Sequence, residues 1–151
     1  MREFTAQSLL VSSTVQLWDV YCKGCRREQS ADECVPATQL VFPYRGVYVR
    51  HRGHDETVAE ANQVLFFNGG EEYRVSHPVC GGDASLAVVI SAPMLRELAQ
   101  RTLLCDGGAL AFRRQRLRID ARAITCGTAP AQPSGVNPPL RQTAIGTLAV
   151  F

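Results

Sequence analysis

Short segments of alternating side chains, separated by turns, constrain the fold of this chain more than any other feature. Residues 14–22 (TVQLWDVYC) alternate between two faces, and residues 38–53 contain two strand-like runs around Pro43. Turn residues follow at 54–57 (HDET) and again at 68–70 (NGG). About seven such strands, spaced by roughly 8–12 residues, predict an all-β sandwich or barrel.

The hydrophobic period changes after the last predicted strand. Apolar side chains recur at helical spacing over residues 93–104, with Pro93 near the start and two glycines beyond the end, which predicts a helix. Residues 126–139 are rich in Pro, Gly and Ser and predict a linker or loose loop. Residues 140–151 begin a helix or form a truncated tail. The sequence therefore predicts one domain over residues 1–125.

Several motifs together resemble a known family. They are the strand FPYRGVYVR (42–50), the run LFFNGGEEYRVSHP (65–78), the Gly-Gly-Asp at 81–83 and the segment SAPMLREL (91–98). Residues 15–104 are similar to the N-terminal cupin-type sensor domain of AraC-family transcriptional regulators. The resemblance implies a mainly β, cupin-like barrel (a double-stranded β-helix) with a short C-terminal helical part.

The resemblance also implies a function. In that family the barrel senses an effector or mediates dimerisation, and a separate helix-turn-helix domain binds DNA. We therefore expect a non-catalytic effector-sensing or dimerisation domain that forms a homodimer. DNA would be bound only through a helix-turn-helix domain, which is not visible after Phe112. The alternative is a stand-alone cupin-fold metal-binding protein, or an enzyme, with an atypical cysteine-containing site.

The usual metal centre of catalytic cupins is not expected here. Aligning the two cupin motifs on the glycines of this chain places Asp32, Cys34, Gln39 and Tyr73 at ligand positions. Gln39 offers no carboxylate, and Tyr73 is a poor replacement for imidazole. The sequence therefore predicts that the protein is not an enzyme.

The cysteines suggest a different metal. Cys22 and Cys25 form a C-x-x-C pair, Cys34 follows in the same polar loop, and Cys80 lies in another loop. Four thiolates are one of the ligand sets that zinc binds tetrahedrally, which makes zinc the candidate cofactor. A single C-x-x-C pair is a weak signal, so redox-responsive thiols and a disulfide remain open alternatives.

A second candidate site surrounds His77. Strand alternation puts Tyr73 and His77 on one face together with Val75, and a hydroxyl and an imidazole on an apolar wall are typical of an effector pocket. Aromatic candidates for the walls of that pocket are Trp18, Phe42, Phe66 and Tyr48. The alternative is that His77 caps a strand end and that these aromatic side chains are core.

Charge and hydropathy limit the partners. A net charge of +2 is too small to indicate a nucleic-acid-binding surface, and the basic run 112–118 (FRRQRLR) is typical of a solvated strand or helix. No signal peptide and no apolar run long enough to cross a membrane are seen. We therefore expect a cytoplasmic protein whose partners are a small-molecule effector or a metal ion, without a membrane partner.

Overall fold

The computed structural model describes residues 4–24, 27–107 and 109–119, which form a mainly β fold with one short α-helix. The strands are β1 (Phe4–Val11), β2 (Val15–Cys22), β3 (Gln39–Arg45), β4 (Tyr48–Arg52), β5 (Asp55–Ala59), β6 (Gln63–Phe67), β7 (Arg74–Ser76), β8 (Asp83–Ile90), β9 (Leu104–Gly107), β10 (Ala109–Phe112) and β11 (Arg116–Arg118). The helices are α1 (Ala92–Leu98) and the 3₁₀ turn η1 (Arg101–Leu103). The predicted mainly β architecture with a short helical part is confirmed.

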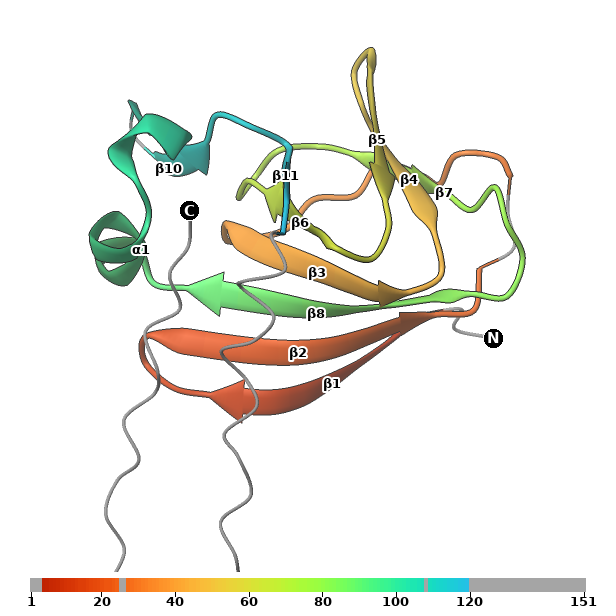
Figure 1. The fold of residues 1–151 in the computed structure, drawn as a ribbon, viewed down its shortest axis with the longest axis horizontal. Coiled ribbons are helices and arrows are strands. Elements are labelled where there is room, and N and C mark those ends of the chain that lie inside the picture. Colours follow the sequence, from red (N-terminus) through yellow and green to blue (C-terminus); the bar gives the residue numbers. More distant parts are fainter. Residues whose placement is uncertain (1–3, 25–26, 108, 120–151) are drawn as a thin grey trace, which may run out of the picture.

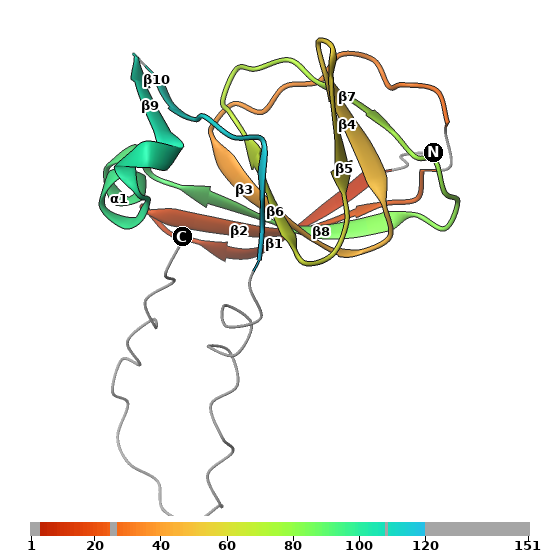
Figure 2. The same ribbon diagram turned by 45° about the horizontal axis from the view of Figure 1, so that its top comes forward.

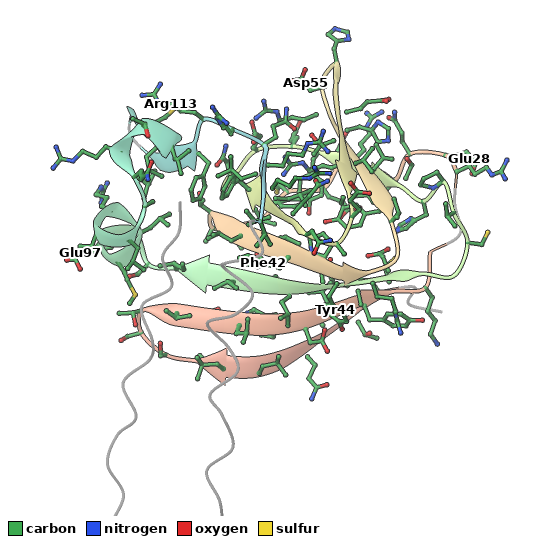
Figure 3. All side chains as sticks on the ribbon, in the orientation of Figure 1. Glu28, Phe42, Tyr44, Asp55, Glu97 and Arg113 are labelled. Carbon is green, nitrogen blue, oxygen red and sulfur yellow. The ribbon has the colours of Figure 1, made fainter. Side chains whose placement is uncertain are left out.

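Two sheets face each other across the interior of the barrel (Figures 1 and 2). The larger has the strand order β1-β2-β8-β3-β6-β11, and the smaller has the order β5-β4-β7. The β10-β9 ribbon lies near α1 at one end of the molecule. Side chains from both sheets project into the space between them (Figure 3). The interior between the sheets holds the site described below.

Strand β8 lies inside the larger sheet, paired on one side with β2 and on the other with β3. Its sequence, DASLAVVI, is rich in small and β-branched side chains, which suit a strand with neighbours on both edges. The ladder with β2 runs from Val15↔Ile90 to Cys22↔Asp83 without a register shift. Residues directly opposite each other project to the same face of a sheet, so Cys22 and Asp83 are side-chain neighbours.

Strand β6 supplies both halves of the core. All five of its residues are buried, and alternation sends Val64 and Phe66 into one cluster and Leu65 and Phe67 into the other. The first cluster includes α1 and the β9–β10 ribbon, and there the Phe66 ring stacks on Phe112 with centroids 4.0 Å apart. The second cluster lies inside the barrel. Strand β6 therefore belongs to both clusters and connects them into one core. Burying each of these large apolar side chains stabilises the fold by about 1.5–3 kcal/mol.

The helical part is shorter than the predicted helix over 93–104. Helix α1 ends at Leu98, because Ala99 takes up an extended conformation (φ −84°, ψ 142°), and the chain then makes a 3₁₀ turn and enters β9. Leu95, Leu103 and Leu104 all pack in the first core cluster. Breaking the helix brings these three side chains into one cluster, so tertiary packing overrides the helical period of the sequence.

The basic run 112–118 is part of the sheet structure. It leaves β10 at Phe112 and forms β11, which pairs with β6. The predicted linker at 126–139, the tail at 140–151 and the end of the predicted first domain lie outside the described residues. Within the described part of the chain, no helix is both long and apolar enough to cross a membrane.

Candidate metal site and ligand cavity

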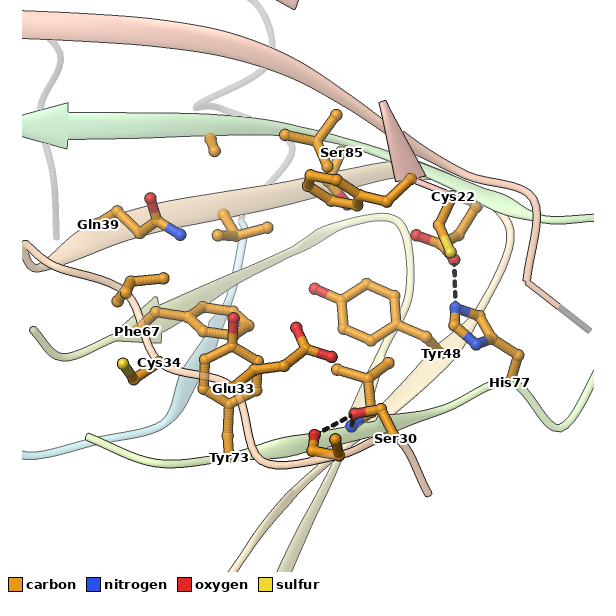
Figure 4. A pocket seen from close by; sticks show the side chains of 18 of the residues that line it. Cys22, Ser30, Glu33, Cys34, Gln39, Tyr48, Phe67, Tyr73, His77 and Ser85 are labelled. Atoms are coloured by element: carbon orange, nitrogen blue, oxygen red, sulfur yellow. Dashed lines mark hydrogen bonds and ion pairs between the residues drawn. The ribbon is translucent and has the colours of Figure 1, made fainter. Parts of the chain in front are cut away.

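A cavity of about 620 Å³ occupies the interior of the barrel (Figure 4). Its walls come from the inward faces of β2, β3 and β8, from β7 and from the loop that precedes β3. That loop is held against β7 by backbone hydrogen bonds between Glu33 and Tyr73 in both directions and by the Ser30 amide, which donates to the Val75 carbonyl. Cavities of this volume accommodate small organic molecules.

Three potential metal ligands meet at one end of this cavity. Cys22 and Asp83 are brought together by the β2–β8 register, and His77 reaches them from the segment that leaves β7. One ligand atom from each side chain lies within 4.8 Å of the other two. Figure 4 shows Cys22 and His77 at this end and Gln39 and Cys34 at the other.

His77 and Asp83 form a close and nearly buried pair. His77 Nε2 lies 2.8 Å from Asp83 Oδ2, and the two side chains are only 11% and 8% exposed. The contact is an ion pair when the imidazole is protonated. A divalent cation held by both side chains would compensate the buried carboxylate in the same way.

Gly24 leaves room for this arrangement. A Cβ atom at residue 24 would lie 2.7 Å from His77 Cε1 and Nδ1 and 3.1 Å from Cys22 Sγ. The Gly24 amide also donates a hydrogen bond to Cys22 Sγ at 3.3 Å. A donor directed at sulfur favours the thiolate, which is the form that binds metal.

A second glycine fixes the backbone at the same end. Gly82 has φ +73°, and a Cβ there would lie 2.4 Å from the Cys22 carbonyl oxygen. Only glycine allows this close approach, which sets the start of β8 against the end of β2.

Burial dominates the electrostatics around the cluster. Burial raises the pKa of the Asp83 carboxyl, and His77 and Arg45 act in the opposite direction. Burial also raises the pKa of the Tyr48 phenol, and the Asp83 carboxylate adds to that effect. An ion of charge +2 would compensate the thiolate and the carboxylate together.

The structure groups Cys22 with His77 and Asp83 instead of with the other cysteines of the predicted zinc site. Cys80 is disulfide-bonded and has no thiol to offer. Cys34 is an exposed thiol on the loop that precedes β3, and it joins no ligand cluster among the described residues. Cys25 lies outside those residues. Sequence analysis missed Asp83 as a ligand, and the cross-strand pairing with Cys22 is the signal that reveals it.

The side chains predicted around His77 are divided between two places. Tyr73 and His77 face the cavity together with Val75, in agreement with the alternation along β7. Trp18 packs against the barrel cluster, whereas Phe42 and Phe66 belong to the cluster beside α1. The aromatic walls of the cavity include Tyr48, which is among the predicted candidates, and Phe67, which sequence analysis did not single out.

The residues aligned with the usual cupin ligands are not gathered into a metal site. Asp32 forms an exposed ion pair with Arg74, with Arg74 Nε 2.6 Å from Asp32 Oδ1. Gln39, Cys34 and Tyr73 line the cavity away from the Cys22–His77–Asp83 cluster. The cluster therefore occupies a different position from the one that the motif alignment predicts.

No protein-family model matches the sequence, and no curated protein matches it. Solved structures do resemble the fold. A protein of unknown function from Rhizobium leguminosarum bv. viciae 3841 superimposes with a TM-score of 0.50 at 11% identity, over 58% of this chain and 81% of that one. A cupin superfamily protein from Desulfitobacterium hafniense DCB-2 gives 0.47 at 15% identity, over 59% and 78% of the two chains. The chain has the mainly β, cupin-like barrel that the sequence predicts.

A third similar structure is the EutQ protein of Clostridium difficile, with a TM-score of 0.49 at 12% identity over 59% of this chain and 68% of that one. At these identities the similarity concerns the fold and not the activity. The AraC-type role rests on the sequence resemblance.

Proposed function

We propose that this protein is a cupin-fold metal-binding protein in which Cys22, His77 and Asp83 hold a zinc ion at one end of the cavity. The observation that carries the proposal is the convergence of Cys22, His77 and Asp83, whose ligand atoms all lie within 4.8 Å of one another. One thiolate, one imidazole and one carboxylate form a mixed donor set that suits zinc.

We further propose that the role is binding and not catalysis. Three protein ligands leave a coordination position open, and a zinc ion there supplies a Lewis acid that can hold a ligand in the cavity. Tyr48 and Tyr73 flank the cavity, and burial raises the pKa of both phenols. They therefore stay protonated near neutral pH and act as hydrogen-bond donors instead of general bases.

The test is a zinc titration of chelator-treated protein against a competing chromophoric chelator. We expect about one zinc ion per chain, and we expect Cys22→Ser, His77→Ala and Asp83→Asn each to weaken binding by tenfold or more. Cys34→Ser is the matched control, because it removes a thiol that lines the same cavity outside the cluster. Loss of zinc in Cys34→Ser with retention in Cys22→Ser would overturn the proposal.

A sensor role is the second candidate, favoured by the motifs at 42–50 and 65–78 and by the internal cavity. In that role the zinc site or the cavity would respond to an effector, the domain would form a homodimer, and a separate domain would bind DNA. Sequencing the source gene beyond codon 151 tests it. An in-frame helix-turn-helix region supports a regulator, and a stop codon at that point contradicts it.

A further inference from the structure

Ser85 places a hydroxyl group inside the cavity. The residue lies two positions after Asp83 on the inward face of β8 and is 3% exposed. Apart from the neighbouring Tyr48 hydroxyl, its Oγ has no hydrogen-bond partner among the described residues. A hydroxyl can donate once and accept twice, so a buried hydroxyl with so few partners indicates a further partner that enters the cavity.

Tyr48 supplies a second hydroxyl beside the first. The side chain is 6% exposed, and its ring lies 6.4 Å from the His77 ring, centroid to centroid. Figure 4 shows the Tyr48 hydroxyl directed into the cavity. Tyr48 and Ser85 line the same cavity as Asp83, so the two hydroxyls and the metal cluster share one space.

The rest of the cavity sets the shape and orientation of a ligand. Val20, Val41 and Ala87 form apolar walls between the two ends. Glu28 and Glu33, both exposed, line the cavity from the loop that precedes β3. Figure 4 shows the Glu33 carboxylate beside Tyr48 and Tyr73, so an anionic group is repelled from this middle part of the cavity and is attracted to the metal.

We infer that the cavity binds a small organic carboxylate with an apolar body. One carboxylate oxygen occupies the open position of the metal, and the other accepts hydrogen bonds from Ser85 and Tyr48. The inference rests on the proposed zinc site. An ammonium group would bind less well, because it would face a metal cation and two hydrogen-bond donors. An alcohol would also bind less well, because it has one oxygen, whereas the metal and the hydroxyls together offer partners for two.

The experiment measures binding of matched probes by isothermal titration calorimetry, in carboxylate-free buffer, to zinc-loaded and zinc-depleted protein. The probes are phenylacetate, 2-phenylethanol and 2-phenylethylamine, which share an aromatic body, and hexanoate as an aliphatic acid. We expect phenylacetate or hexanoate to bind the zinc-loaded protein at least about tenfold more tightly than the zinc-depleted protein, and more tightly than the alcohol or the amine.

Variants test the two hydroxyls. Ser85→Ala and Tyr48→Phe are each expected to weaken binding of the carboxylate probe by roughly tenfold and to leave zinc affinity unchanged. Tyr44→Phe is the control, because Tyr44 is an exposed tyrosine bonded to Asp19.

The outcomes separate this inference from the proposed function. Zinc binding without carboxylate binding, or carboxylate binding that is equally tight without zinc, overturns the inference and leaves the zinc site in place. Tighter binding of the amine or the alcohol also overturns it. Failure of zinc to bind at all overturns the proposed function and the inference together.

Discussion

Replacing Gly24 by alanine should disable the metal site while leaving all three ligands in the chain. The new Cβ would lie 2.7 Å from two atoms of the His77 ring, whereas carbon atoms in contact are separated by about 3.5–4.0 Å. His77 must therefore retreat by about 1 Å. Metal–ligand distances tolerate only about ±0.2 Å, so the imidazole leaves coordination distance of a metal shared with Cys22 and Asp83.

The displacement of His77 should change both the zinc affinity and the free energy of unfolding. Loss of one correctly placed ligand should weaken zinc binding by at least roughly ten- to a hundredfold. Stability changes by two opposing terms. Alanine restricts the unfolded chain and contributes about 0.4–1 kcal/mol, while breaking the His77–Asp83 contact costs about 1–3 kcal/mol. The net expectation is a loss of about 1–2 kcal/mol in the free energy of unfolding.

The assay combines chelator competition for zinc affinity with urea unfolding for stability. Gly53→Ala is the control: Gly53 has φ +56° and nothing within 4 Å of a new Cβ. That variant should lose about 1–2 kcal/mol of stability through backbone strain alone, with zinc affinity unchanged. Wild-type zinc affinity in Gly24→Ala would refute the argument that His77 and Cys22 share an ion beside residue 24.

Two further predictions concern stability. Partial burial raises the pKa of Tyr73 to about 12, so the phenol ionises in the unfolded chain before it does in the folded one, and stability should fall by about 1–2 kcal/mol between about pH 10 and about pH 12. Urea unfolding in this range should show a shallower decline for Tyr73→Phe, and an identical decline contradicts the assignment. Arg50 is buried and donates to the Phe66 carbonyl at 2.6 Å and to Gln115, so Arg50→Lys should cost about 2–4 kcal/mol by leaving these acceptors unpaired. Thermal unfolding measures this cost, and an unchanged midpoint would show that lysine replaces the guanidinium.

Local patterns predicted the strands well because the pleat repeats every two residues. Alternation correctly placed Tyr73, Val75 and His77 on one inward face. The same pattern could not predict which strands pair, since a shift of two residues preserves every inward and outward position. The neighbouring positions of Cys22 and Asp83 depend on the β2–β8 register, which appears only in the folded chain.

Two other differences have physical causes. The C-x-x-C pair predicted a zinc site made of cysteines. In the structure Cys22 lies with His77 and Asp83 instead, and Cys80 is disulfide-bonded. The helical spacing of apolar residues extends beyond Leu98, but helix α1 ends there. Packing of Leu103 in the core stabilises the fold more than a longer exposed helix would. In both cases long-range contacts decided the outcome.

The most direct test of the zinc site is X-ray absorption spectroscopy of the zinc-loaded protein. The Cys22–His77–Asp83 site predicts one sulfur ligand at about 2.3 Å and nitrogen or oxygen ligands at about 2.0–2.2 Å. The single sulfur should disappear in Cys22→Ser. A shell of three or four sulfur atoms would contradict the site and return zinc to the cysteine loop, and a shell without sulfur would exclude Cys22 as a ligand.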